Sequence, residues 1–250
     1  MGQKLKLGIL LFVLGLTGIL SLMAAHINPA QLPPEITRAF TLGQLKLLTL
    51  INPTALLVIA VAVGVNVHRR VNLHAPLIER HLLGAQNNSR LSAIVPYGTA
   101  GGVLAGVLLS AVGALGAGLL PEELERLGTN VQLPPVTRLL YGGITEELLL
   151  RFGFMSFIAW ALWKLTGTRS GATYLVAIAL AAAVFAALHL PVVYQAVAAP
   201  SAGLIGYVLA GNVIGGLVFG WLYWQRGLEA AIIGHVTAHL VMMGVENIIR

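Results

Sequence analysis

The sequence predicts an all-α fold, a polytopic bundle of about seven transmembrane helices. Of the 250 residues, 57% are hydrophobic and 10% are charged, whereas soluble domains carry roughly 25% charged residues. The apolar residues lie in long runs, and about 20 of them are enough to cross roughly 30 Å of hydrocarbon. Because the runs are too long for strands and show no alternation of polar and apolar residues, they do not fit a sheet.

The expected helices are separated by segments that carry Pro, Asn, Gly and nearly all of the charge, as interfacial loops do. The first apolar run, Leu7 to Ala25, follows Lys4 and Lys6 and so has the charge pattern of a secretory signal. It is longer than the apolar part of a cleaved signal, about 7–15 residues, and we expect it to be retained as the first span. The expected helices cover residues 7–25, 47–67, 95–120, 136–164, 172–198, 203–224 and 228–249.

The distribution of Lys and Arg predicts the orientation, because cytoplasmic loops carry an excess of both. With a cytoplasmic N-terminus, nine Lys and Arg side chains fall on the cytoplasmic side and five on the other: Lys4, Lys6, Arg69, Arg70, Arg80, Arg90, Lys164, Arg169 and Arg226 against Arg38, Lys46, Arg126, Arg138 and Arg250. We therefore expect a multi-pass protein of the plasma membrane with its N-terminus in the cytoplasm.

Cysteine and charge content narrow the function classes. The chain has no Cys, which excludes disulfides, a thiolate metal site and a cysteine nucleophile. The 15 basic and 9 acidic residues give a net charge of +6, but no basic run is interleaved with aromatic residues, so nucleic acid is not an expected partner. In a membrane protein, a basic excess instead fits loops that face the anionic lipid of the bilayer.

Small residues four positions apart predict close packing between helices in lipid. Such pairs occur in the third and sixth expected helices, where they are Gly102 with Gly106, Gly211 with Gly215, and Gly216 with Gly220.

The fourth expected helix carries three ionisable residues, each of which is costly inside a membrane and needs a partner or a function. Glu147 and Arg151 lie four apart, on one helical face and within pairing distance. Glu146 is rotated about 100° away in an α-helix, so Arg151 is poorly placed to neutralise both carboxylates. Glu146 is therefore the candidate general base. The alternative is a structural Glu–Arg pair with Glu146 extended towards the interface.

Histidines lie in the fifth and seventh expected helices. Phe185 and His189 share a face, and Pro191 predicts a kink or local unwinding just beyond the histidine. Taken alone, His189 fits the alternative that it is a hydrogen-bonded packing residue without a catalytic role. His235 and His239 lie one turn apart on one face, a spacing that suits zinc.

Only the two histidines of a zinc-binding H-E-x-x-H motif are present. Val236 stands where an H-E-x-x-H metalloprotease has its glutamate. A zinc site would have to draw on other helices, with His189, His235, His239 and Glu146 as ligands. Two carboxylates, one arginine and three histidines in three apolar helices predict a functional site, with or without metal.

At these residues the sequence resembles the type II CAAX prenyl endopeptidases and the bacterial CPBP, or abortive-infection, proteins. The E-E-x-x-x-R motif of that family matches Glu146, Glu147 and Arg151, and its F-x-x-x-H motif matches Phe185 and His189. The last motif, H-x-x-x-N, matches His235, but position 239 is His rather than Asn or Asp. The resemblance divides the chain into residues 1–133, three N-terminal spans with their loops, and residues 134–250, the CPBP-like catalytic core.

The resemblance implies an intramembrane endopeptidase that acts on a membrane-associated or lipidated peptide or protein. It implies that Glu146 and His189 activate a water molecule and that His235 and His239 stabilise the oxyanion, with Glu147, Arg151 and Phe185 in support. No cofactor is then required, and bound zinc is the alternative. A proton-coupled transporter or a non-catalytic membrane immunity or scaffold protein would use the same polar cluster differently.

Overall fold

The computed structural model describes residues 2–26, 29, 32–84 and 90–249. In this part of the chain every regular element is a helix. The elements are α1 (Gln3–Ser21), η1 (Leu22–Ala24), α2 (Pro34–Ala39), α3 (Leu42–Thr49), α4 (Ile51–Val67), η3 (His68–Val71), α5 (Pro76–Leu83), α6 (Leu91–Leu119), α7 (Pro121–Asn130), α8 (Pro135–Thr137), η4 (Arg138–Glu146), η5 (Leu148–Met155), α9 (Ser156–Thr166), α10 (Gly171–Ala187), α11 (Leu190–Ala196), α12 (Ala202–Arg226) and α13 (Leu228–Ile249).

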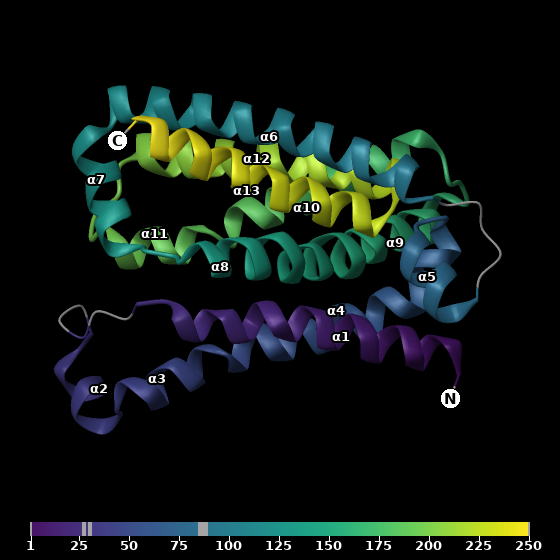
Figure 1. Ribbon diagram of the computed structural model, residues 1–250, viewed down its shortest axis with the longest axis horizontal. Coiled ribbons are helices and arrows are strands. Elements are labelled where there is room, and N and C mark those ends of the chain that lie inside the picture. Colours follow the sequence, from purple (N-terminus) through teal and green to yellow (C-terminus); the bar gives the residue numbers. More distant parts are fainter. Residues whose placement is uncertain (1, 27–28, 30–31, 85–89, 250) are drawn as a thin grey trace.

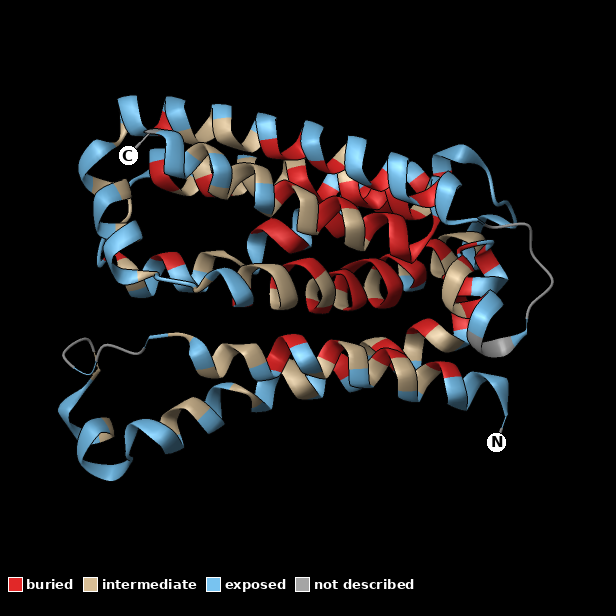
Figure 2. Ribbon diagram, in the orientation of Figure 1, coloured by how far each residue is buried: buried red, intermediate tan, exposed pale blue. Residues whose placement is uncertain are grey.

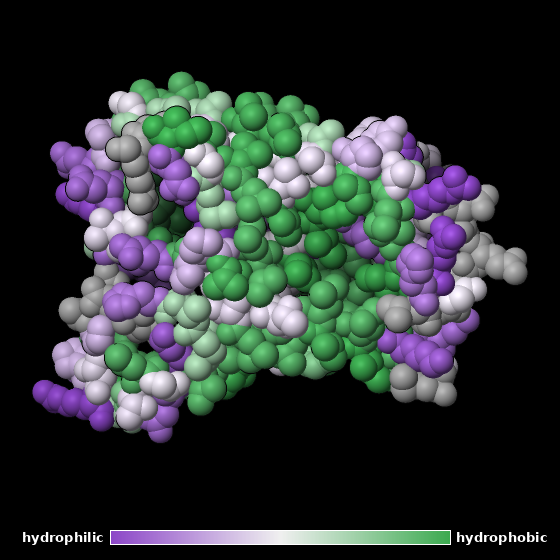
Figure 3. Space-filling model, viewed as in Figure 1, coloured by the Kyte–Doolittle hydropathy of each residue, from purple (hydrophilic) through white to green (hydrophobic). Residues whose placement is uncertain are grey.

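Seven continuous helical stretches of the described chain are long and apolar enough to cross a membrane, as the sequence predicted. They run roughly parallel to the long axis of the molecule in Figure 1. The middle of the visible surface is hydrophobic and the hydrophilic residues gather at the two ends (Figure 3). The chain is therefore an all-α, multi-pass membrane protein. Helix ends differ by a few residues from those expected, and the second stretch, Leu42–Val71, begins five residues early.

The core lies where the fourth, fifth, sixth and seventh stretches meet, and the buried residues concentrate there (Figure 2). Figure 1 shows α1 and α4 as a pair beneath η4 and η5, whereas α6, α12 and α13 lie on the other side. Thr145 in η4 donates a hydrogen bond to the Gly15 carbonyl of α1 at 2.7 Å. Thr137 donates to Ser21 of the same helix at 2.8 Å. The N-terminal pair is thus attached to the helix that carries the carboxylates, and the division at residue 133 stays a prediction.

The fourth stretch is a helix as expected, but its central part has π-helical geometry. Residues Arg138–Glu146 and Leu148–Met155 are π-helical, with only Glu147 between them. The angle of 100° expected between Glu146 and Glu147 assumed an α-helix, and the wider π turn changes it. Since π geometry makes poorer use of backbone hydrogen bonds and is often found at functional sites, its position around Glu146 and Glu147 is informative.

The fifth stretch breaks next to His189, slightly earlier than Pro191 predicted. Helix α10 ends at Ala187 and α11 begins at Leu190, so His189 lies in the turn between them. Pro191 occupies the first turn of α11, where its missing N–H leaves no helical hydrogen bond unmade. The break places His189 at a helix end instead of inside a regular helix.

Two of the three predicted glycine pairs lie in helix contacts. A Cβ atom on Gly106 would lie 2.6 Å from Val241 Cβ of α13, and one on Gly216 would lie 2.6 Å from Ala182 Cβ of α10. The prediction for Gly211 and Gly215 was wrong. A Cβ on Gly211 meets only Leu109 at 3.7 Å, and Gly215 meets only Phe219 of its own helix. Both line a cavity, so their small side chains leave space instead of a helix contact.

The loop before α5 is fixed by a buried carboxylate outside the membrane-spanning stretches. Glu79 accepts hydrogen bonds from His68 Nε2 at 2.9 Å and from Arg69 Nε at 3.2 Å. Although burial raises the pKa of Glu79, the bonds from His68, His74 and Arg69 outweigh it and lower that pKa well below its ordinary value. Glu229 of α13 accepts from the backbone N–H groups of Leu77 and Ile78 at 2.9 Å each, which ties α5 to the bundle.

Gly18 of α1 provides a test of the packing between α1 and η4. A Cβ atom there would collide with Leu140 and Thr145, and the contact with Leu140 is to its backbone, which cannot move aside. Gly8 of the same helix has room, since its nearest neighbours would lie at 3.8 Å. We expect Gly18→Ala to lower the free energy of unfolding by about 1–3 kcal/mol through overpacking, and Gly8→Ala to leave it unchanged. Thermal unfolding of the purified protein in detergent measures both, and equal melting temperatures for the two variants would contradict the packing.

Candidate active site

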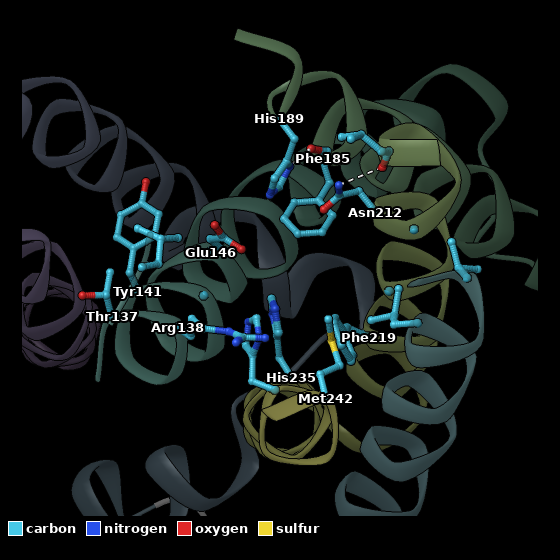
Figure 4. Close-up of a pocket in the computed structure, with 18 of the residues that line it drawn as sticks. Thr137, Arg138, Tyr141, Glu146, Phe185, His189, Asn212, Phe219, His235 and Met242 are labelled. Atoms are coloured by element: carbon cyan, nitrogen blue, oxygen red, sulfur yellow. Dashed lines mark hydrogen bonds between the residues drawn. The ribbon is translucent and has the colours of Figure 1, made fainter. Parts of the chain in front are cut away.

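The four residues expected to act on substrate line one cavity of about 250 Å³. Glu146 comes from η4, His189 from the turn between α10 and α11, and His235 and His239 from α13. Figure 4 shows the labelled side chains of Glu146, His189 and His235 directed into this space from three sides. Apolar residues supply much of the remaining wall, among them Phe185 and Phe219.

Glu147 does not line the cavity but lies directly behind it. Its Oε1 atom lies 2.8 Å from His235 Nδ1 and 3.0 Å from Arg151 Nη1. The Glu147 side chain is 0% exposed and that of Arg151 is 1% exposed, so both charges are removed from water and depend on each other. The predicted Glu147–Arg151 contact is therefore present, and the sequence did not indicate that Glu147 also holds His235.

Arg151 lies between aromatic rings. Its guanidinium carbon is 4.9 Å from the centre of the Phe185 ring and 5.5 Å from that of Phe219, and Nη2 donates to the Gly216 carbonyl at 3.3 Å. Aromatic faces attract a cation, more strongly where water is excluded. Phe185 therefore stabilises the arginine and also packs edge-on against His189, with ring centres 4.8 Å apart.

Glu146 and His189 are the more accessible pair. Both are partly exposed, whereas Glu147 and His235 are buried. Within the described residues, Glu146 makes no hydrogen bond or ion pair, so its carboxylate can accept a proton from the cavity. His189 Nδ1 lies 2.8 Å from the carbonyl oxygen of Phe185 and donates to it. This bond sets the tautomer and leaves Nε2 as the nitrogen available to a water molecule.

His235 and His239 form a stack along α13. Their ring centres are 4.9 Å apart and the planes are inclined by 19°, while Phe219 covers His235 with ring centres 4.3 Å apart. Gly142 of η4 allows the histidines to approach, because a Cβ there would lie 2.6 Å from His239 Nε2. His239 Nδ1 is buried and has no hydrogen-bond partner in the described part of the chain. Most buried polar atoms in proteins have a partner, so this nitrogen has hydrogen-bonding capacity that the described residues do not use.

The zinc alternative stays a prediction. Among the described residues, no three His, Cys, Asp or Glu side chains lie close enough together to hold a metal ion. His235 uses Nδ1 for Glu147 and His189 uses Nδ1 for a backbone carbonyl. His235 and His239 both belong to α13, whereas His189 and Glu146 come from other parts of the chain.

The cavity extends towards the end of the bundle that carries α7 and α11. Its lining includes residues of four helices and of the segment before α8, namely Val112, Leu133, Arg138, Tyr207 and Met242. Figure 1 shows α8 beginning further inside the bundle than the ends of α6 and α13 at that side.

Several polar residues of the cavity were not predicted from the sequence. Thr137, Arg138, Tyr141 and Asn212 all line it, and Asn212 donates from its side chain to the Val208 carbonyl at 2.8 Å. Asn212 is a polar residue in an apolar helix, and that signal alone could have indicated a role in the cavity. Arg138 was taken as an interfacial residue, and nothing in the sequence shows that it turns inward.

Part of the chain matches a known family. Residues 132–241 match the family model described as type II CAAX prenyl endopeptidase Rce1-like. Neither a curated protein nor a solved structure matches the chain. The matched segment contains every residue predicted for the site, from Glu146 to His239, and the match supports a protease. Over residues 132–241, this membrane protein is therefore similar to the Rce1-like type II CAAX prenyl endopeptidases.

Proposed function

We propose that the protein is an intramembrane endopeptidase that hydrolyses a peptide bond with a water molecule activated by Glu146. The observation that supports this most is the single cavity lined by Glu146, His189, His235 and His239. Acyl transfer to water requires a general base, a group that orients the water and donors for the oxyanion. Glu146 is the base, and within the described residues it has no cation in contact with it. His189 has one free ring nitrogen, and the imidazoles of His235 and His239 are fixed as a pair.

In the first step, Glu146 accepts a proton from a water molecule that His189 Nε2 orients. The hydroxide equivalent attacks the scissile carbonyl carbon, and the carbonyl oxygen becomes an oxyanion. Because the walls of the cavity are largely apolar, few competing water molecules surround the reacting groups. Electrostatic interactions are stronger in such an environment than in water.

His235 is the proposed oxyanion donor, and Glu147 is the residue that prepares it. With Nδ1 bonded to the Glu147 carboxylate at 2.8 Å, His235 directs Nε2 into the cavity. With the ring protonated, Nε2 carries a proton and donates a hydrogen bond to the oxyanion. His239, stacked on His235, supplies a second donor. When the intermediate collapses, Glu146 returns its proton to the leaving amine.

The proposed orientation has a consequence for the substrate. In the orientation expected from the sequence, the protein lies in the plasma membrane and its N-terminus is cytoplasmic. The end of the bundle that carries α7 and α11 is then extracytoplasmic. The cavity then receives a peptide or membrane protein from the outer leaflet side. The mostly apolar lining favours a hydrophobic segment as the part that enters.

Replacing Glu146 by Gln tests the function directly. The amide keeps the size of the side chain and cannot accept the proton, so we expect peptide-bond hydrolysis to fall by at least about 10²-fold, within the range for loss of a general base. The measurement is quantitative proteomics of peptide termini in membranes from cells that carry the parent or the variant.

Glu122→Gln is the matched control, because that carboxylate is 85% exposed on α7. Termini that disappear in Glu146→Gln but persist in Glu122→Gln, at equal protein levels, identify substrates. A phenotype that survives Glu146→Gln unchanged would instead indicate a transporter or scaffold.

Position 239 tests the metal-free mechanism, since the family motif has Asn there. If His239 only donates a hydrogen bond, His239→Asn keeps a donor and should retain much of the activity. His239→Ala should lose about 10²–10³ in kcat, the usual effect of removing one oxyanion donor. Hydrolysis of a substrate from the terminus analysis measures both.

Elemental analysis of the purified protein completes this test. A metal-free site predicts no stoichiometric zinc and no inhibition by chelators. Asn is a poor zinc ligand, so one bound zinc per chain together with an inactive His239→Asn variant would contradict the metal-free mechanism.

A further inference from the structure

The cavity contains one Arg or Lys side chain among its described lining residues, and that side chain is paired in a specific way. Arg138 Nη1 lies 2.8 Å from Glu246 Oε2, and Nη2 lies 2.9 Å from Oε1. These two parallel bonds form the planar fork that guanidinium makes with a carboxylate. Arg138 begins η4 and Glu246 belongs to the last turn of α13, so the pair joins the two helices that carry Glu146 and His235.

The two partners differ in their exposure. The Arg138 side chain is 19% exposed, whereas that of Glu246 is 45% exposed. Glu246 lies in a helix end whose neighbours Asn247 and Ile248 are also exposed. Figure 4 shows Arg138 reaching from η4 towards the helix of His235 at the edge of the cavity. A carboxylate on an exposed helix end can therefore leave while the guanidinium stays in the cavity wall.

We propose that Arg138 is a binding site for a carboxylate of the substrate peptide, and that Glu246 occupies this site in the free protein. The inference rests on the proposed function, because it assumes that a peptide enters the cavity. An incoming carboxylate exchanges with that of Glu246 and forms the same two bonds. The carboxylate comes from a peptide C-terminus or from an acidic side chain, and both present the same planar group.

A binding site and a purely structural ion pair predict different effects of substitution on peptide binding. A strut between η4 and α13 is broken equally by removing either partner, so Glu246→Gln and Arg138→Gln would impair binding alike. A competing internal carboxylate predicts opposite effects. Glu246→Gln frees the guanidinium and strengthens peptide binding, whereas Arg138→Gln removes the site and weakens it.

The experiment measures equilibrium binding of a short fluorescein-labelled Leu/Ala peptide by anisotropy, in detergent, with the full-length protein. The Glu146→Gln background prevents consumption of the peptide. The peptide is used as the free C-terminal acid, as the C-terminal amide, and as the amide with one internal Glu. Glu122→Gln, which removes the exposed partner of Arg126 on α7, is the matched control for loss of one carboxylate.

We expect Glu246→Gln to tighten binding of a carboxylate-bearing peptide and Arg138→Gln to weaken it by about tenfold, the effect of one charge-assisted hydrogen bond. The plain amide should respond to neither. If the substitutions change binding of the free acid alone, the site recognises a peptide C-terminus. If they change binding of the internal Glu form alone, it recognises an acidic side chain. Melting temperatures of both variants, measured alongside, show whether each is folded.

Weaker binding in both variants, or equal binding of acid and amide in all proteins, would overturn the proposal. Failure of the proposed function has a different signature. A peptide that binds with these opposite effects but is never cleaved by the parent protein would refute hydrolysis and leave the carboxylate site intact. Cleavage that depends on Glu146 without opposite effects of Arg138 and Glu246 would do the reverse.

Discussion

The rest of the site depends on the contacts that the Glu147 carboxylate makes. One of its oxygens contacts both Arg151 and His235, and all three groups are buried. Removing one member of such a buried pair leaves an uncompensated charge at a cost of about 3–5 kcal/mol. The charge of Arg151 is in turn shared with the rings of Phe185 and Phe219. Four helical stretches are thereby joined at one level, and His235 is fixed for a function in the cavity.

The membrane explains why the polar groups divide into two layers. In hydrocarbon each ionisable group needs a partner, and the inner layer of Glu147, Arg151 and His235 supplies partners within itself. Glu146 and His189 form the outer layer and face the cavity, where their partners are water and substrate. The π-helical geometry of Arg138–Glu146 and Leu148–Met155 lets two adjacent glutamates serve these different layers. Glycines at positions 142 and 18 bring η4 close to α13 and α1.

Much of this could be predicted from the sequence, because hydrophobic runs and intramembrane charges are strong local signals. The seven spans, the Glu147–Arg151 contact and the break near His189 all followed from spacing and composition. Spacing does not give the depth at which separate helices meet, and so the 2.8 Å contact between Glu147 and His235 was not foreseen. Nor does it distinguish glycines that pack, such as Gly106, from those that leave space, such as Gly211. Arg138 was assigned to the interface because spacing does not show its pairing with Glu246, more than 100 residues later.

The most direct test of the account is an experimental structure of the Glu146→Gln variant with a bound substrate peptide. If His235, held by Glu147, is the oxyanion donor, the scissile carbonyl oxygen should lie about 3 Å from His235 Nε2, a normal hydrogen-bond distance. The Glu147–His235 contact should be unchanged. A peptide bound outside the cavity, or one whose carbonyl points away from α13, would contradict the account.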